Sequence, residues 1–164
     1  MSTTQHNADK IAVFADVQNI YYTTRQTYQR QFNYRRFWQQ IEQQGTVVTA
    51  LAYATERGDP SQQKFQSALR HIGFDVKLKP FIQRADGSTK GDWDVGITID
   101  VIDAAPDVDT VILLSGDGDF GLLLSHIKNQ YQVKTQVYGV LSLTADSLIS
   151  ACDQLFPIAE ELLL

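Results

Sequence analysis

The sequence predicts an α/β fold in which a mostly parallel sheet lies between two layers of helices. Short apolar segments suited to buried strands alternate along the chain with longer segments of helical periodicity. This alternation favours a parallel sheet over an antiparallel one. No internal repeat or long linker divides the sequence. We therefore expect a three-layer α/β/α sandwich, with residues 1–9 as a disordered polar tail and residues 10–164 as a single domain.

The predicted strands are short apolar runs. Residues 11–15 and 111–114 are almost continuously apolar, which is typical of strands buried on both faces. Residues 74–80 alternate apolar with polar side chains, so this strand is expected nearer an edge of the sheet. Two further strands are expected at residues 47–54 and 133–140. The closing residues 155–164 are expected to form a short strand and helix or to pack irregularly.

The predicted helices are segments with apolar residues three and four positions apart. They are expected at residues 21–30, 33–44, 60–72, 120–129 and 145–154, and from about residue 92 onward. In the helix that begins near Asp92, we expect Val95, Ile99 and Ile102 to share the buried face. Residues 83–91 are polar and contain glycine, and they are expected to form a mobile loop.

Composition narrows the class of protein. The net charge of −5 argues against strong nonspecific attraction to nucleic acid, although carboxylates gathered at a metal site are offset by their cations. The single cysteine excludes an internal disulfide and a cysteine-based zinc site. No apolar run approaches the ~20 residues that cross a bilayer, and the N-terminal residues do not resemble a secretory signal. We expect a cytoplasmic protein with no membrane association.

Aspartates follow two of the predicted buried strands. Asp16 ends the first, and Asp117 and Asp119 lie in a Ser-Gly-Asp-Gly-Asp loop after the strand at residues 111–114. Parallel strands bring their carboxyl ends to the same edge of a sheet, where Asp94 could add a fourth carboxylate. Clustered carboxylates repel one another, and a hard divalent cation such as Mg²⁺ or Mn²⁺ relieves that repulsion. Taken singly, each aspartate has the alternative of a solvent-exposed or helix-capping role.

Three motifs resemble those of a known family. Residues 14–19 (Phe-Ala-Asp-Val-Gln-Asn) resemble the first motif of the NYN domains, which belong to the PIN-like nuclease superfamily. Residues 90–95 (Lys-Gly-Asp-Trp-Asp-Val), with Ile-Asp at 99–100, resemble the second, and residues 115–120 (Ser-Gly-Asp-Gly-Asp-Phe) resemble the third. The ensemble is most similar to the bacterial LabA-like branch, over about residues 10–140.

The resemblance implies a PIN-like sandwich with metal-dependent ribonuclease activity. It assigns the acidic, metal-binding set to Asp16, Asp94, Asp117 and Asp119, which would hold one or two Mg²⁺ or Mn²⁺ ions. Asp100 matches a second acidic position on the same helix as Asp94. It is a weaker candidate, because six residues separate the two and a regular helix would point them apart.

Two polar residues accompany the acidic set in the family motifs. Asn19 follows the first aspartate, where either substrate contact or capping of a helix is expected. Ser115 precedes the last acidic pair, where it would orient a carboxylate or a ligand.

Basic residues near the same edge would bind the phosphates of a nucleic acid. We expect this role for Arg57, Arg84 and Lys90. A second basic run follows Asn19 and includes tyrosines that could stack on unpaired bases; the alternative is a solvated helix face with its tyrosines partly packed. This second group comprises Arg25, Arg30, Arg35, Arg36, Tyr21, Tyr22 and Tyr34. Single-stranded RNA is the favoured substrate, chiefly because of the family resemblance.

Three other functions are compared with this one, and the last of them is set aside. The first is a catalytically weak regulatory domain that binds RNA or a protein, and the apolar residues 162–164 could serve a homodimer instead of packing inward. The second is a phosphatase of the haloacid-dehalogenase kind, but Gln18 stands where that chemistry needs an acid. The third is a Rossmann enzyme, but no glycine-rich phosphate loop follows the first strand.

Overall fold

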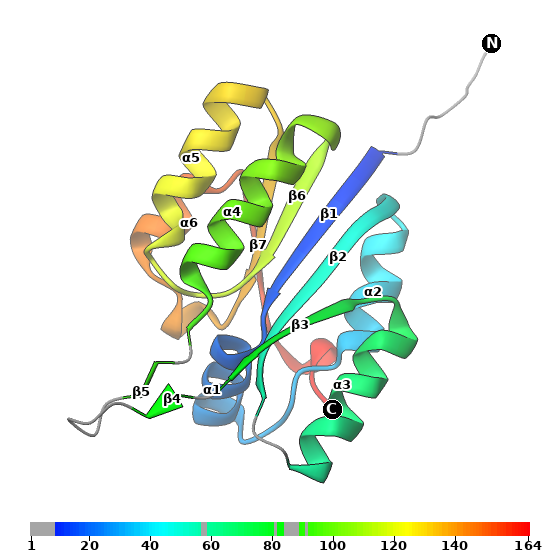
Figure 1. The fold of residues 1–164 in the computed structure, drawn as a ribbon. Coiled ribbons are helices and arrows are strands. Elements are labelled where there is room, and N and C mark those ends of the chain that lie inside the picture. The colour runs from blue at the N-terminus through cyan, green and yellow to red at the C-terminus, as the bar shows by residue number, and fades with distance from the viewer. Residues whose placement is uncertain (1–8, 57–58, 81, 84–88, 91) are drawn as a thin grey trace.

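The fold is seen in a computed structural model that describes residues 9–56, 59–80, 82–83, 89–90 and 92–164. At residues 80, 82–83 and 89–90 only the backbone is described. A six-stranded parallel sheet lies between two layers of helices, so the predicted three-layer sandwich is confirmed (Figure 1).

The sheet has the strand order β3-β2-β1-β6-β7-β8, and all five neighbouring pairs are parallel. Its strands are β1 (Asp9–Asp16), β2 (Gly45–Glu56), β3 (Asp75–Pro80), β6 (Thr110–Leu114), β7 (Lys134–Gly139) and β8 (Gln154–Pro157). The edge position predicted for residues 74–80 is confirmed by β3. Because β1 pairs with both β2 and β6, the order of the strands reverses direction there, and such a switch point is where open α/β sheets bind ligands.

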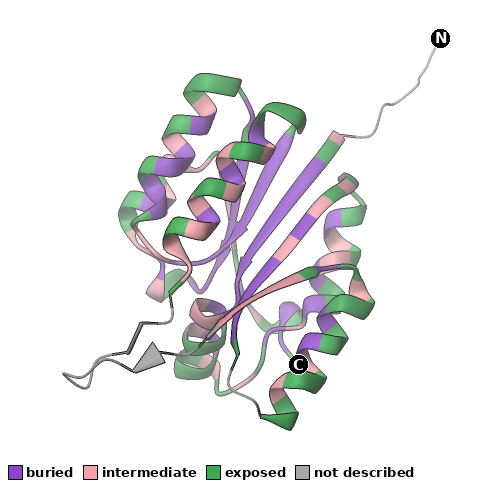
Figure 2. Ribbon diagram, viewed as in Figure 1, coloured by how far each residue is buried: buried purple, intermediate pink, exposed green. Residues whose placement is uncertain are grey.

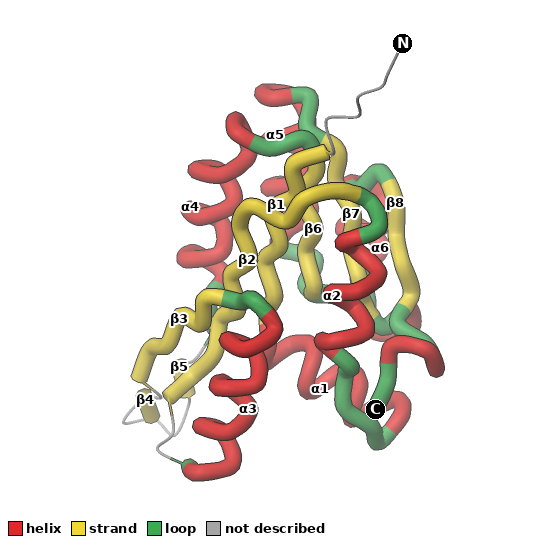
Figure 3. The backbone as a smooth tube through the Cα atoms, turned by 90° about the vertical axis from the view of Figure 1, so that its right-hand side faces the viewer, coloured by secondary structure: helices red, strands yellow, loops and turns green. Residues whose placement is uncertain are grey.

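The helices form one layer on each face of the sheet (Figures 1 and 3). Helices α1 to α3 pack on the face that carries Ile11 and Val13 of β1, whereas α4 to α6 pack on the face that carries Ala12 and Phe14. Their bounds are α1 (Val17–Tyr28), α2 (Tyr34–Glu42), α3 (Pro60–Ile72), α4 (Asp94–Ala104), α5 (Phe120–Tyr131) and α6 (Asp146–Ala151). Short 3₁₀ helices occur at Ala105–Asp107, Leu141–Leu143 and Glu160–Leu162.

The core is centred on β1 and β6, whose apolar side chains are buried on both faces (Figure 2). The side chains from Ile11 to Ala15 are 0% exposed, and every residue of β6 is buried. Continuous apolar runs therefore marked the two central strands correctly, because both of their faces are covered by helices.

Helix α4 differs from the expectation in its orientation. Ile97 and Val101 face the core, while Val95 and Ile99 are 73% and 54% exposed. Ile102, the third residue predicted on the buried face, packs partly against the core. The prediction for Val95 and Ile99 was wrong because α4 carries apolar residues at two helical phases, and periodicity cannot choose between them.

The segment expected to be a loop contains a short pairing. In β4 (Ile82–Gln83) and β5 (Thr89–Lys90), Ile82 pairs with Lys90 and Gln83 with Thr89 in antiparallel register. The rest of that segment, residues 84–88 and 91, lies outside the described part of the chain.

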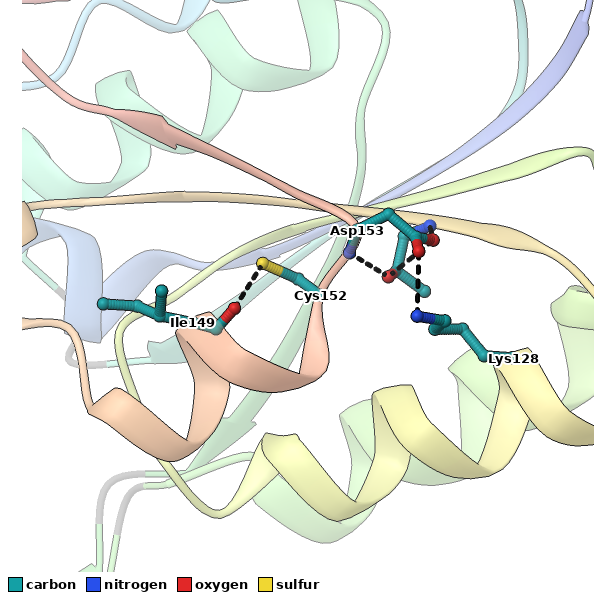
Figure 4. Close-up of polar contacts among 5 residues, drawn as sticks. Lys128, Ile149, Cys152 and Asp153 are labelled. Carbon is teal, nitrogen blue, oxygen red and sulfur yellow. Dashed lines mark hydrogen bonds and ion pairs between the residues drawn. The ribbon is translucent and has the colours of Figure 1, made fainter.

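The last strand is anchored to its neighbour by Asp153. Its carboxylate accepts the backbone N–H of Thr135 at 2.8 Å and the ammonium of Lys128 at 2.8 Å (Figure 4). Partial burial alone would raise the pKa of Asp153, but Lys128 and Thr135 outweigh it and hold that pKa below its ordinary value. Cys152, beside it, directs its thiol to the carbonyl of Ile149 at 3.4 Å (Figure 4).

The final residues pack inward. Leu162 and Leu163 are buried, and an antiparallel bridge joins Leu163 to Phe32. Leu164 remains 64% exposed. Among the described residues, no helix has the length and apolar character needed to span a membrane.

Candidate functional site

The carboxyl ends of β1 and β6 are joined by a network of side chains. The carboxylate of Asp16, at the end of β1, accepts the hydroxyl of Ser115 at 3.2 Å, and Ser115 is fully buried directly after β6. The other oxygen of Asp16 accepts the backbone N–H of Asn19 at 3.4 Å, so Asp16 also caps α1. The side-chain oxygen of Asn19 accepts the N–H of Gly116 at 2.9 Å.

This network gives Asn19 and Ser115 defined positions. Asn19 does not cap α1; instead it joins the start of that helix to the loop after β6. Ser115 donates its hydroxyl proton to Asp16, and its oxygen accepts the N–H of Asp117 at 3.2 Å. Ser115 therefore orients both the first aspartate and the start of the acidic loop.

The two glycines of the acidic loop are required by close packing. A Cβ at Gly116 would lie 2.6 Å from the carbonyl oxygen of Leu143, and one at Gly118 would lie 2.8 Å from the Cβ of Ala145. Neither glycine has a positive φ. Glycine is required at both positions because the loop lies directly against residues 143–147.

Three carboxylates converge beside this loop. Asp94, Asp117 and Asp119 can each place one oxygen so that all three oxygens lie within 4.8 Å of one another. Asp94 begins α4, Asp117 follows β6, and Asp119 precedes α5. Asp119, although positioned as the N-cap of α5, makes no capping hydrogen bond with its side chain. Its carboxylate is thus not committed to the helix.

The electrostatics of the site differ between its members. Burial, together with the charges of Asp117 and Asp92, raises the pKa of Asp16 to about 6, although the Asn19 and Ser115 hydrogen bonds act in the opposite direction. Burial and the neighbouring charges of Asp117 and Asp92 raise the pKa of Asp94 to about 7. Asp92, which the sequence marked only as the start of a helix, therefore adds to the negative potential of the site.

The stability of the protein is expected to depend on pH through these carboxyls. Their folded-state pKa values lie above the ordinary ~3.9, so the folded protein holds these protons more tightly, and stability falls as pH rises from about 4 to 7. A divalent cation binds the ionised form. We expect Mn²⁺ at about 100 times its Kd to raise Tm by about 5–10 °C at pH 8 and by much less at pH 5.

Thermal melts with and without Mn²⁺ at pH 5, 6, 7 and 8 check this result. Taking the difference between the two melts at each pH removes the contribution of carboxyls remote from the cation, such as Asp153. An equal rise in Tm at pH 5 and at pH 8 would contradict the binding of Mn²⁺ to these carboxylates.

Asp100 is committed to a different set of partners. Its carboxylate accepts the hydroxyl of Tyr53 at 2.7 Å and the ammonium of Lys77 at 2.6 Å. It does not belong to the group of three carboxylates formed by the described residues. The contacts to Tyr53 and Lys77 indicate a structural role that joins α4 to β2 and β3.

Replacing Asp100 with asparagine is therefore expected to alter stability more than function. Hydrogen bonds to a charged group contribute about 1.5–3 kcal/mol, so Asp100→Asn should lower the free energy of unfolding by about 1–2 kcal/mol. Binding of Mn²⁺ should stay within about threefold. Urea unfolding measures the change in stability, and calorimetric titration measures the affinity for Mn²⁺. A tenfold loss of Mn²⁺ affinity would return Asp100 to the metal-binding set.

The basic residues are placed only in part. Arg57 and Arg84 lie outside the described residues, and of Lys90 only the backbone is described. Arg25, Arg35 and Arg36 are exposed. The tyrosines differ in their exposure. Tyr21 and Tyr22 are 43% and 53% exposed on α1, whereas Tyr34 is 7% exposed and packs against Phe32.

A parallel α/β/α sandwich with aspartates gathered at its strand ends is the arrangement of the PIN-like nuclease superfamily. Within that superfamily the chain belongs to the NYN domain family, which its sequence matches over residues 10–159.

Two other proteins are similar to this chain. The chain is 29% identical over 122 residues to the Low amplitude and bright protein LabA of Synechococcus elongatus. That match covers 68% of this chain and 63% of LabA, so the chain spans less than two thirds of the relative's length. A crystal structure of the protein of unknown function VPA0982 from Vibrio parahaemolyticus has a TM-score of 0.93 and 51% identity, covering 99% of this chain and 100% of the other.

Proposed function

We propose that the protein is a metal-dependent ribonuclease that hydrolyses phosphodiester bonds of single-stranded RNA in the cytoplasm. One observation carries the proposal: Asp94, Asp117 and Asp119 can bring their oxygens within 4.8 Å of one another at the carboxyl ends of the central strands. Membership of the NYN family supports a nuclease and a nucleic-acid substrate. The choice of RNA, of a single strand and of the cytoplasm belongs to the proposal.

The residues at the site fit a hard divalent cation. Every donor in the group of three is a carboxylate oxygen, the ligand type that Mg²⁺ and Mn²⁺ prefer. The neighbouring negative charges that raise the pKa of Asp94 and Asp16 are those that a cation would offset. Asp94, Asp117 and Asp119 would hold the ion, and Asp16 is close enough for its charge to raise the pKa of Asp94. When bound, such an ion activates a water molecule and stabilises the charge on the leaving oxygen.

The remaining residues of the site hold these carboxylates in place. Ser115 donates to Asp16 and accepts from Asp117, which keeps the first and third family motifs in register. The backbone N–H of Asp119 donates to the carboxylate of Asp117 at 2.9 Å. This contact orients the Asp117 carboxylate within the group of three. No side-chain nucleophile is required, because water attacks the phosphodiester.

The deciding experiment is cleavage of a mixed-sequence single-stranded RNA by the purified protein in Mn²⁺, in Mg²⁺ and in EDTA. An Asp16→Asn/Asp117→Asn double variant is assayed alongside, with Asp103→Asn as control, because Asp103 is an exposed aspartate of α4 outside the site. We expect metal-dependent cleavage that the double variant loses and the control retains.

Two other results would change the conclusion. Binding of Mn²⁺ by calorimetry without any cleavage would favour the alternative of a regulatory domain that binds RNA or a protein. Absence of both cleavage and metal binding would overturn the proposed site itself.

A further inference from the structure

A groove lies beside the acidic site, between α1 and α3. Its volume is about 580 Å³, within the ~300–1,000 Å³ range of small-molecule sites. It adjoins the acidic site through α1, since Val17 and Gln18, directly after Asp16, line it. Ala54 at the end of β2 and Phe65 of α3 line the opposite side. Helix α1 begins at the carboxyl end of β1, and α3 begins near the carboxyl end of β2 (Figures 1 and 3).

The lining of the groove suits a flat, uncharged aromatic ring. Its inner surface is apolar, with Ile20 and Phe32 among the residues that form it. Its polar residues include the amides of Gln18 and Gln62. Among the described residues that line it, none has an acidic side chain, and the charged side chain is that of Lys64. In a protein of net charge −5, this composition favours a ligand that carries phosphate and disfavours a basic peptide.

Tyr34 supplies a second, independent observation. It lines the groove, is 7% exposed, and packs edge-on against Phe65 and Phe74 at centroid distances of 5.8 and 5.9 Å. No hydrogen bond from its hydroxyl to a described residue is found. Burial, with a contribution from the charge of Asp16, raises the pKa of Tyr34, so the hydroxyl remains a donor at neutral pH. The hydroxyl oxygen itself is accessible to solvent, so it can donate to an acceptor on a ligand that enters the groove.

Aromatic side chains also stand at the mouth of the groove. Tyr21 and Tyr22 line it, are both exposed, and form an edge-to-face pair at 5.6 Å. The guanidinium of Arg25 lies 5.7 Å from the ring of Tyr21. Exposed tyrosines beside a cation are typical platforms for unpaired bases, which stack on them whatever their sequence.

We propose that this groove binds one unpaired base of the nucleic-acid substrate, next to the phosphate that the aspartates receive. The inference rests on the proposed nuclease function and adds to it a reason for single-strand selectivity. A base can enter a groove of this size only when it is unstacked, so a duplex would have to open first.

The test fills or strips the groove without touching the acidic site. Ala68→Phe fills it from an exposed position on α3, and Tyr21→Ala/Tyr22→Ala removes the stacking rings. The matched controls are Ser67→Phe, at the neighbouring exposed position of α3, and Tyr131→Ala, an exposed tyrosine at the end of α5. Neither control residue lines the groove. Thermal melts establish that all four variants fold.

Two readouts separate this inference from the proposed function. In cleavage of a single-stranded 12-mer, we expect both groove variants to raise KM about 5- to 100-fold, with kcat within about threefold and both controls near wild type. In the second readout, a 12-mer carrying 4-thiouridine is irradiated with the protein in EDTA, where no cleavage is needed. Crosslinks should map to residues 17–24 and 61–68 and should be lost in Ala68→Phe.

Each alternative outcome has a distinct meaning. Cleavage by the wild type with unchanged KM in both groove variants, and crosslinks elsewhere, would overturn the groove assignment and leave the nuclease intact. Crosslinks in the groove without any cleavage would support the groove and contradict the nuclease. A change of oligomeric state in Ala68→Phe, without crosslinks in the wild type, would assign the groove to a second copy of the chain and overturn the inference.

Discussion

Asp117→Asn is expected to abolish metal-dependent cleavage and, in the same protein, to stabilise the metal-free fold. Even an outer partner of a metal ligand changes metal affinity or activity by about 10- to 100-fold when removed, so losing a candidate ligand should cost at least about 100-fold. The opposite effect on stability arises because the Asp117 charge raises the pKa of both Asp16 and Asp94. Partly exposed like charges a few ångströms apart repel by on the order of 1 kcal/mol.

Thermal melts in EDTA at pH 8 measure the second effect. For a domain of this size, 1 kcal/mol corresponds to a rise in Tm of about 2–4 °C. The rise should shrink at pH 5, where Asp16 and Asp94 of the wild type are largely protonated and repel Asp117 less. If Asp117→Asn loses cleavage and also has a lower Tm in EDTA, then Asp117 stabilises the fold through its contacts, and its repulsion of the neighbouring carboxylates is not the dominant effect.

Gly116→Ala is expected to damage both the fold and the site through a single methyl group. The new Cβ would lie 2.6 Å from the carbonyl oxygen of Leu143, and a backbone atom cannot rotate away as a flexible side chain can. Overpacking of this kind costs about 1–3 kcal/mol. The accompanying shift would disturb the N–H of Gly116 that donates to Asn19, and a displacement of ~1 Å can lower activity by about 100-fold.

Urea unfolding and cleavage rates measure the two effects of this substitution. Ser142→Ala is the control, since Ser142 is an exposed residue of the neighbouring 3₁₀ helix and should change stability by less than about 0.5 kcal/mol. An alanine at position 116 that leaves both stability and cleavage unchanged would mean that the loop at residues 143–147 can move away at little cost.

Much of the fold could be predicted from the sequence because the strongest patterns coincide with burial. The apolar runs at β1 and β6 are buried on both faces, and α3 covers Pro60–Ile72 as expected. The orientation of α4 could not be predicted. Ile97 and Val101 compete with Val95 and Ile99 for the core, and only the packing of α4 against its neighbours decides between them.

The candidate site was predictable as a gathering of aspartates but not in its internal contacts. Asp16, Asp117 and Asp119 follow strands that the sequence marked clearly, so their common edge follows from the topology. The contacts of Asp100 with Tyr53 and Lys77 could not be predicted, because these two residues lie on β2 and β3 and no local pattern connects them to α4. Nor could the sequence separate Tyr34, which is buried, from Tyr21 and Tyr22, which are exposed.

The pairing of β1 with β6 has a consequence for synthesis of the protein. Asp16 and Ser115 are 99 positions apart in the chain, yet the acidic site exists only after their two strands have paired. Contacts between distant segments form late and slowly in folding, because closing a long loop costs entropy before the contact is made. A nascent chain that still lacks β6 therefore carries Asp16 without its partners. Under the proposed nuclease function, such a chain would lack the assembled acidic site and so would not yet cleave RNA.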